Sequence, residues 1–374
     1  MPAMPETRVW LLRHGTSSFN VQRRCQGCCD DSELTPQGRE AARISGERLA
    51  TAGIEAVISS PLRRATDTAE EVLKGIRAQD RKITLETDAR LREIELHEWE
   101  GLPLEEIPRR FPEQFLAWRS RPGDLQMQSA SGEVQYPVGN LYYRARLFWN
   151  DLLATCAGKS VLLVTHSGTA RALIASALGL GTEHFHGFQQ SNCGVSRLCF
   201  SPDSRQPRLE LLNDTAHLGK LLPKLKEGRR GMRLLFIPVT DANAAEVRQF
   251  AAVLEGVDID KLLVAGPIAR LAAVRIFQAS ADSNLMISEH AVDRNVSDAL
   301  QCDSGDQLSH VAIVGPPLTL RRMLQHQLAF SDSAAESLDL SRLGITFVHH
   351  PGNGVPPVLQ AVNMFESIPS AVGA

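Results

Sequence analysis

Short apolar runs that end at polar or small residues recur along the first half of the chain. The first, Val9–Leu12, is followed directly by a cation, an imidazole and a glycine. Because the run does not alternate with polar positions, it is typical of a strand buried on both faces of a parallel sheet. Ala56–Ser59 and Ser160–Thr165 have the same pattern, and Val195–Phe200 predicts a further strand.

Helical patterns separate these strands. Thr35 and Pro36 have the residue types of an N-cap and a first helical position, which predicts a helix to about Ala52. Further helices are predicted near 62–76, 141–155 and 169–177, whereas 102–135 suits an irregular or helical cap. The alternation predicts an α/β fold of three layers, in which a mostly parallel sheet has helices on both faces.

Charged and imidazole side chains lie where these strands end. In open α/β sheets, ligands bind beyond the carboxyl ends of the strands. Arg13 and His14 follow the first strand, Arg64 opens the helix after the second, and His166 follows Ser160–Thr165. Taken singly, a surface arginine or a satisfied core histidine explains each residue as well, so the interpretation depends on the set.

Composition narrows the functional class. The chain has 374 residues, which favours two domains, and a net charge of −3, which argues against nucleic-acid and anionic-membrane partners. No apolar run approaches the ~20 residues of a membrane helix, and the start of the chain has no apolar signal core, so we expect a cytoplasmic protein. Cys25, Cys28 and Cys29 cluster among seven cysteines without zinc spacing, so we expect reduced thiols, with a regulatory role left open.

Two histidines, two arginines and one carboxylate suit phosphoryl transfer. The negative charge on a transferring phosphoryl group needs preorganised cations, and arginine supplies a permanently charged fork. A neutral imidazole can act as the nucleophile. Because no metal-ligand cluster is visible, we expect neither a metal nor another cofactor.

Residues 8–200 resemble the histidine phosphatase superfamily, which includes cofactor-dependent phosphoglycerate mutase. The matching motifs occur in the family's order and are Arg13-His14-Gly15 with Asn20, Arg24-Cys25-Gln26-Gly27, Ser60-Pro61-Leu62-Arg63-Arg64-Ala65, Leu91-Arg92-Glu93-Ile94 with Trp99-Glu100-Gly101, and Val164-Thr165-His166-Ser167-Gly168 with Arg171.

The resemblance implies a mechanism in two steps. His14 would attack phosphorus and become a phosphohistidine, and Glu93 would protonate the leaving oxygen and then take a proton from water. The flanking arginines should hold the pKa of His14 below ~6.5. The groups expected to hold the phosphoryl oxygens are Arg13, Arg64, His166 and Asn20, and further substrate contacts are implied for Arg24, Gln26, Gly27 and Ser167.

The motif around the acid favours a phosphatase over a mutase. Leu91-Arg92-Glu93-Ile94 with Trp99-Glu100-Gly101 is similar to the hydrolytic branch, which usually has glycine where this chain has His97. That histidine is interpreted either as a ligand for a substrate carboxylate or as a surface residue. A phosphoglycerate mutase and a non-catalytic binding or regulatory protein remain the alternatives.

Segments near 177–195 are similar to cyanobacterial metal-independent phosphoserine phosphatases and to the plastid 2-carboxyarabinitol-1-phosphatase. This similarity implies a small phosphorylated metabolite that also carries a carboxylate, such as phosphoserine or a phosphorylated sugar acid. A homodimer is possible.

The second half is interpreted as a smaller, degenerate α/β copy of the first. We predict a catalytic domain over 1–222, a charged linker over 223–230 and the copy over 231–374. Val239 then falls at the position of His14 and Pro316 at that of His166, so the copy lacks both histidines. Aligning Gly266–Arg270 with Ser60–Arg64 would leave Arg270 in the place of Arg64.

Overall fold

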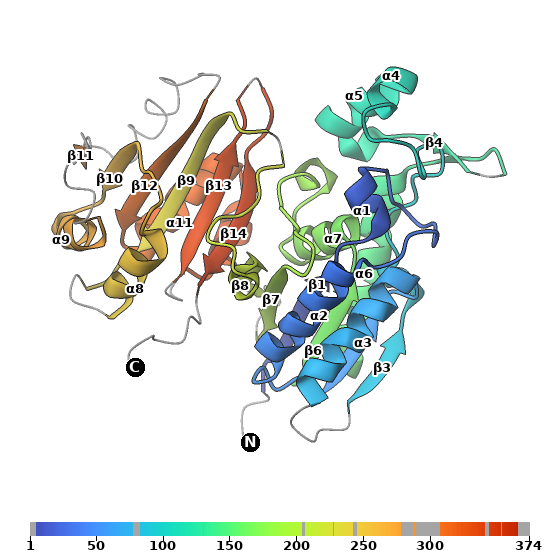
Figure 1. The fold of residues 1–374 in the computed structure, drawn as a ribbon, viewed down its shortest axis with the longest axis horizontal. Helices are drawn as coiled ribbons and strands as arrows, with labels where there is room; N and C mark the ends of the chain where they lie inside the picture. Colours follow the sequence, from blue (N-terminus) through green and yellow to red (C-terminus); the bar gives the residue numbers. More distant parts are fainter. Residues whose placement is uncertain are drawn as a thin grey trace. The chain divides into compact units, whose positions relative to one another are not determined.

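The computed structural model describes residues 5–77, 83–129, 131–203, 206–226, 228–241, 245–277, 287–288, 307–340, 344–352 and 354–365. The chain divides into two compact units, Met1–Arg208 and Leu209–Ala374 (Figure 1). In the described residues, no helix is both long enough and apolar enough to cross a membrane.

The first unit is built on a mostly parallel sheet with the strand order β3-β2-β6-β1-β7. β1 pairs in parallel with β6, β6 with β2, and β2 with β3, whereas β7 is antiparallel to β1. The strands are β1 Thr7–Arg13, β2 Ala56–Ser59, β3 Thr84–Thr87, β6 Ser160–Thr165 and β7 Val195–Phe200.

Helices cover both faces of this sheet. Successive side chains of a strand point to opposite faces, and every residue of Val9–Leu12 is at most 5% exposed. The predicted three-layer α/β arrangement is therefore confirmed. The helices are α1 Ser18–Gln22, α2 Pro36–Leu49, α3 Arg63–Arg77, α6 Pro137–Thr155 and α7 Ser167–Ala177.

The cap expected over 102–135 consists of short elements: α4 Ile107–Arg110, α5 Pro112–Ser120, β4 Met127–Gln128 and β5 Val134–Gln135. α6 begins at Pro137, four residues before the predicted start at Leu141. Proline is favoured at the first helical position because its missing N–H needs no partner there.

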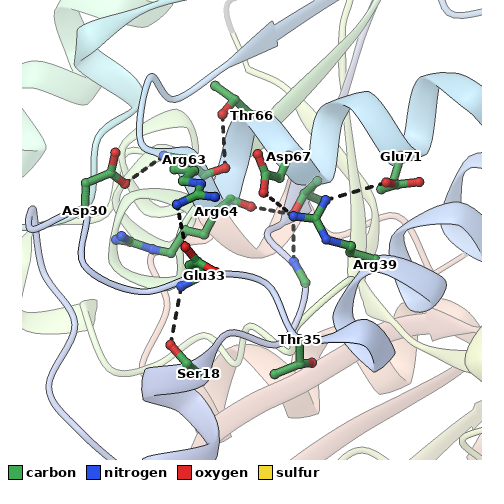
Figure 2. Close-up of polar contacts among 12 residues, drawn as sticks. Ser18, Asp30, Glu33, Thr35, Arg39, Arg63, Arg64, Thr66, Asp67 and Glu71 are labelled. Atoms are coloured by element: carbon green, nitrogen blue, oxygen red, sulfur yellow. Dashed lines mark hydrogen bonds and ion pairs between the residues drawn. The ribbon is translucent and has the colours of Figure 1, made fainter.

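α2 and α3 pack closely against each other. Arg39 of α2 pairs with Asp67 of α3 at 2.6 Å and approaches Glu71 at 3.6 Å (Figure 2). At the contact, a Cβ built on Gly46 would lie 2.2 Å from the carbonyl oxygen of Val72. Only glycine permits this approach of the two backbones.

The second unit has the strand order β11-β10-β12-β9-β13-β14-β8. Its strands are β8 Arg208–Asp214, β9 Gly231–Pro238, β10 Lys261–Val264, β11 Ile287–Ser288, β12 Leu308–Gly315, β13 Ile345–His350 and β14 Val358–Met364. Its helices are α8 Ala245–Leu254, α9 Pro267–Ile276, α11 Pro317–Leu328 and α12 Asp332–Glu336.

The pairing of these strands repeats that of the first unit. β9 is parallel to β12 and antiparallel to β13, as β1 is to β6 and β7, and β10 lies between β11 and β12, as β2 lies between β3 and β6. The amide of His14 donates to Thr165 O at 2.9 Å, and the amide of Val239 donates to Gly315 O at 2.9 Å. Val239 thus occupies the position of His14, and Pro316 that of His166.

One part of the predicted alignment is wrong by one residue. The amide of Ser60 donates to Val164 O, and the equivalent bond in the second unit runs from Ala265 to Val314 O. Counting from Ser60 to Arg64, the matching position is therefore Ala269. Arg270 lies one residue further along α9 and is exposed, so it does not replace the buried Arg64.

The segment predicted as a linker is bound by side chains of the second unit. Arg233 Nη2 donates to Pro223 O at 2.6 Å, and His349 Nε2 lies 3.0 Å from Arg230 O. The compact units divide between residues 208 and 209, whereas the sequence analysis placed the domain end at 222. Most of β8 lies on the second unit's side of this division, where it pairs with β14 through Leu212 and Val362.

We expect Gly46→Ala to destabilise the first unit by about 1–3 kcal/mol, because the added methyl group overlaps the backbone of α3 and overpacking costs this much. Calorimetry of the full chain should show a lower melting temperature for the first unit.

The matched control is Gly139→Ala in α6, where the nearest atom to the new Cβ is Tyr136 Cβ at 3.6 Å. Alanine is about 0.5–1 kcal/mol better than glycine inside a helix, so this variant should melt at the same temperature or higher. Equal effects of the two substitutions would contradict the close contact of α2 and α3.

Candidate active site

The two predicted histidines lie side by side at one edge of the sheet. His14 directly follows β1, and His166 directly follows β6 and caps α7. Because β1 and β6 are neighbouring parallel strands, their carboxyl ends meet. The ring centroids of His14 and His166 are 5.1 Å apart, and both residues are at most 2% exposed.

The backbone of Gly15 fixes the orientation of the His14 ring. His14 Nδ1 lies 2.8 Å from Gly15 O. A carbonyl oxygen can only accept, so the neutral ring carries its proton on Nδ1 and donates it to Gly15 O. The lone pair is then on Nε2, the atom able to act as a nucleophile. The amide of Gly15 in turn donates to Thr68 Oγ1 at 3.0 Å.

His166 is held from the end of a third strand. Its Nε2 lies 2.8 Å from Ser60 Oγ, and Ser60 follows β2. The buried Nδ1 of His166 has no hydrogen-bond partner among the described residues.

Arg64 is completely buried in the first turn of α3. Its Nη2 donates to Gly27 O at 2.6 Å and its Nη1 to Cys29 O at 2.8 Å. The preceding residue, Arg63, is exposed and binds the same loop, since its amide donates to Asp30 (Figure 2). Two arginines in succession therefore hold the loop that follows α1, one from inside and one from the surface.

Gly27 is needed where Arg64 holds this loop. Its amide donates to Glu100 Oε1 at 2.7 Å, and Glu100 Oε2 accepts from the amide of Cys29 at 3.3 Å. A Cβ at Gly27 would lie 2.8 Å from Ile94 O, so a larger residue would push the loop off the segment that carries Glu93.

Arg13 completes the cationic group. Its Nη1 donates to Gln190 O at 2.9 Å, whereas Nε of Arg13 and Nε of Arg64 are buried without a partner in the part of the chain that the structure describes. Together with His166 Nδ1, buried polar atoms of three predicted residues lack protein partners around His14. Buried polar groups normally have partners, so these atoms are suited to hold an anion.

Glu93 reaches the site from the segment after β3. It is 6% exposed, and its oxygens accept from the amides of Gly168 and Thr169, both at 3.0 Å, at the start of α7. A Cβ on Gly168 would lie 2.5 Å from Glu93 Oε1. Helix N-termini favour negative charge, so the sequence of α7 is adapted to this carboxylate.

Asn20 belongs to a network with a residue to which the sequence analysis gave no role. Asn192 Nδ2 lies 3.0 Å from His14 O and 2.9 Å from Asn20 Oδ1, and Asn20 Nδ2 lies 3.4 Å from Gln26 Oε1. Asn192 precedes β7, which is antiparallel to β1, so the start of β7 lies at the active-site edge. The sequence analysis did not predict that this strand runs antiparallel to β1, so it did not place Asn192 near His14.

The remaining predicted substrate contacts differ in placement. Arg24 is exposed and donates to Gly101 O, and the exposed His97 lies 3.8 Å from Glu95. The contacts described for these two residues do not join them to the histidines. Ser167 is the first residue of α7, next to His166.

Burial and positive charge together keep the imidazoles neutral. Loss of solvent on burial is the largest cause that holds the pKa of His14 well below 6.5, and the charges of Arg13 and Arg64 lower this pKa further. Desolvation and Arg64 do the same for the pKa of His166. Desolvation also lowers the pKa of Arg13 to about 10, so it still carries its charge at neutral pH. The site therefore combines neutral imidazoles with permanent cations.

Among the described residues, no group of three or more His, Cys, Asp or Glu side chains is placed to hold a metal ion. The anion-binding donors found around His14 are guanidinium and imidazole groups.

A family model for the histidine phosphatase superfamily (branch 1) matches residues 9–215, more than half of the chain. The chain therefore belongs to the histidine phosphatase superfamily, and the resemblance inferred from the sequence motifs is confirmed.

The chain is 40% identical over 212 residues to the probable 2-carboxy-D-arabinitol-1-phosphatase of Arabidopsis thaliana, a match that covers 56% of this chain and 42% of that protein. It is 27% identical over 213 residues to phosphoserine phosphatase 1 of Hydrogenobacter thermophilus, covering 57% and 95%. Among solved structures, YhfR of Bacillus stearothermophilus has a TM-score of 0.50 and 30% identity, covering 57% and 99%. The match thus spans about two fifths of the plant relative.

We expect His14 to remain neutral, with its proton on Nδ1, at pH 6 in the folded protein. Its folded pKa lies below the unfolded value of about 6.5. The unfolded chain therefore binds more protons as pH falls, and the stability contributed by the neutral ring is lost below that pH. Nitrogen-15 chemical shifts of the imidazole between pH 5.5 and 8 test the expectation.

The control is the same resonance in the urea-unfolded chain, which should titrate near pH 6.5. A folded-state titration at that pH would show that burial, Arg13 and Arg64 do not lower the pKa of His14 as described.

Proposed function

We propose that this chain is a phosphomonoesterase that acts through a phosphohistidine on small phosphorylated carboxylates. One observation carries the proposal: a neutral imidazole with its lone pair on Nε2 lies inside a group of buried cations. A phosphate dianion fits such a site in two ways. Its oxygens accept hydrogen bonds from the unpartnered donors, and its phosphorus is the atom that His14 Nε2 would attack.

In the first step, His14 Nε2 attacks phosphorus and the bond from phosphorus to the ester oxygen breaks. Glu93, in its protonated form, gives its proton to that oxygen, which leaves as an alcohol. Arg13 and Arg64 stabilise the charge on the three remaining oxygens.

His166 supports the same oxygens. When the hydroxyl of Ser60 donates to His166 Nε2, the proton of the neutral ring is on Nδ1, which then donates to a phosphoryl oxygen. The bond from His14 Nδ1 to Gly15 O stabilises the positive charge that the imidazole gains on phosphorylation.

In the second step, water attacks phosphorus and the bond to His14 Nε2 breaks. Glu93, now a carboxylate, removes a proton from the water, and phosphate is released. Besides the substrate and one water molecule, the two steps use side chains of this chain, and Glu93 ends as it began, protonated.

The substrate class rests on charge and on the relatives. Arg13, Arg64 and Arg144 each lower the pKa of His166, and Arg171 lowers the pKa of Arg13. Glu93 raises the pKa of Arg13, Arg64 and Arg144. Several arginines near the histidines suit a substrate with a carboxylate besides its phosphate. The names of the two phosphatase relatives refer to such substrates, phosphoserine and 2-carboxyarabinitol 1-phosphate.

We expect the purified chain to release phosphate, in the presence of EDTA, from at least one member of a panel of phosphoserine, 2- and 3-phosphoglycerate and carboxyarabinitol phosphate. His14→Asn should lower the rate at least about 10⁴-fold, because the nucleophile is lost. It should also abolish the acid-labile phosphoprotein trapped from the wild-type chain.

The control is His97→Asn, whose exposed side chain lies outside the histidine pair and should leave phosphoprotein formation intact. Interconversion of the phosphoglycerates faster than phosphate release would favour a mutase. A well-folded His14→Asn variant that still forms phosphoprotein would overturn the assignment of the nucleophile.

A further inference from the structure

Three successive carbonyl groups around the proposed acid are bound by side chains from distant parts of the chain. Thr165 Oγ1 donates to Leu91 O at 2.8 Å. Arg144 Nη2 donates to Arg92 O at 2.6 Å and to Glu93 O at 3.0 Å. The donors come from β6 and α6, more than 50 positions further along the sequence.

Two more donors complete the set. Thr169 Oγ1 donates to Arg92 O at 2.6 Å, and Cys28 Sγ lies 2.9 Å from Glu93 O. A carbonyl oxygen has two lone pairs, so the carbonyls of Arg92 and Glu93 are both fully used. Among the residues that the structure describes, Arg144 is the one group that donates to both carbonyls.

Regular secondary structure does not fix this segment. The 3-10 helix η1, Ala89–Leu91, has Arg92 as its C-cap residue, and 93–106 contains turns but no helix or strand. The direction of the Glu93 side chain therefore depends on these side-chain bonds and on three amides that donate to its carboxylate, those of Ile94, Gly168 and Thr169.

Burying the charged side chain of Arg144 costs desolvation free energy, which its hydrogen bonds to the carbonyls of Arg92 and Glu93 help to offset. Arg144 is half-buried in α6, and desolvation lowers its pKa. Arginines out of water are usually paired with a carboxylate, yet among the described residues no carboxylate lies within ion-pair distance of Arg144. Its hydrogen bonds go to the two carbonyls, while its Nε is buried without a partner.

We propose that Arg144 is a positioning residue for the proton transfer by Glu93: its guanidinium holds the two peptide groups that aim the carboxyl at the leaving oxygen. The inference rests on the proposed function, because it requires Glu93 to be the acid. Arg144 itself need not touch the substrate.

The proposal has a signature in the leaving group. An alkoxide is strongly basic, so the leaving oxygen of an alkyl phosphate must be protonated as it departs. p-Nitrophenolate is a weak base and leaves without a proton. Misplacing Glu93 should therefore slow the first step with phosphoserine far more than with p-nitrophenyl phosphate. A general loosening of the site would slow both substrates alike.

The experiment compares Arg144→Gln with wild type by rapid-quench measurement of the first turnover on both substrates. General acid catalysis contributes typically 10²–10⁴-fold, so we expect a loss of about 10²-fold with phosphoserine and less than about threefold with p-nitrophenyl phosphate. Glu93→Gln gives the benchmark pattern. Arg144→Lys, which keeps a charged donor for one carbonyl, should recover part of the loss.

The matched control is Arg146→Gln, an exposed arginine two residues further along α6, which should behave as wild type with both substrates. Equal losses with the two substrates in Arg144→Gln, or no loss with either, would overturn the proposal.

A second variant keeps the test decisive if Arg144→Gln does not fold. Cys28→Ala removes one of the two donors to Glu93 O without changing the charge, and it should show a weaker form of the same leaving-group pattern. Cys28→Ser, which keeps a donor, should show none, and the absence of any difference between the two would count against the proposal. Failure of the proposed function itself is recognised separately, as a wild-type chain that forms no phosphoprotein or a Glu93→Gln variant that does not discriminate between the leaving groups.

Discussion

The structure depends on keeping an uncharged imidazole inside a buried group of guanidinium ions. Each cation placed out of water carries a large desolvation cost, and the hydrogen bonds described for Arg13 and Arg64 go to neutral carbonyl groups. Arg64 binds the carbonyls of Gly27 and Cys29, and Arg13 binds that of Gln190. Because these acceptors carry no full negative charge, the field at His14 stays positive. An ion pair in their place would cancel much of the attraction that an incoming phosphate feels.

This constraint explains why so many loops meet at one edge of the sheet. The loop after α1 supplies carbonyls to Arg64, the segment after η1 supplies Glu93, and the segment before β7 supplies Asn192. Each loop is held in turn by a residue from elsewhere, as Glu100 holds Gly27 and Arg63 holds Asp30. The carboxyl ends of the parallel strands give these contacts a rigid base, which loops alone would lack.

The sequence was informative where one residue type does one task. Apolar runs located the strands, and the rule that parallel strands share an active edge placed His14, Arg64 and His166 together. It was less informative where a task is divided among distant residues. Asn192 and Arg144 act through backbone carbonyls, and every residue type has the same carbonyl, so the sequence does not reveal these contacts.

Arg24 and His97 belong to recognisable motifs, yet their side chains are exposed, because a motif fixes a position along the chain and not the direction of a side chain. The alignment of Arg270 with Arg64 was wrong because it matched similar residue types in the two sequences. The hydrogen bonds between the strands set a register that differs from that match by one residue.

The two units share the same strand pairing but differ in the side chains at the strand ends. The ring separation of 5.1 Å between His14 and His166 is close to the ~4.8 Å between adjacent strands. The spacing of the two histidines therefore matches that of the neighbouring strands that carry them. In the second unit, Val239 and Pro316 occupy the two equivalent backbone positions. The amide of Val239 donates to Gly315 O, as the amide of His14 donates to Thr165 O. Spacing of this kind does not have to be maintained by selection on side chains. A unit that has Val239 and Pro316 at these positions keeps their spacing for as long as it keeps its sheet, so substitution at the strand ends alone would place new side chains at the same separation.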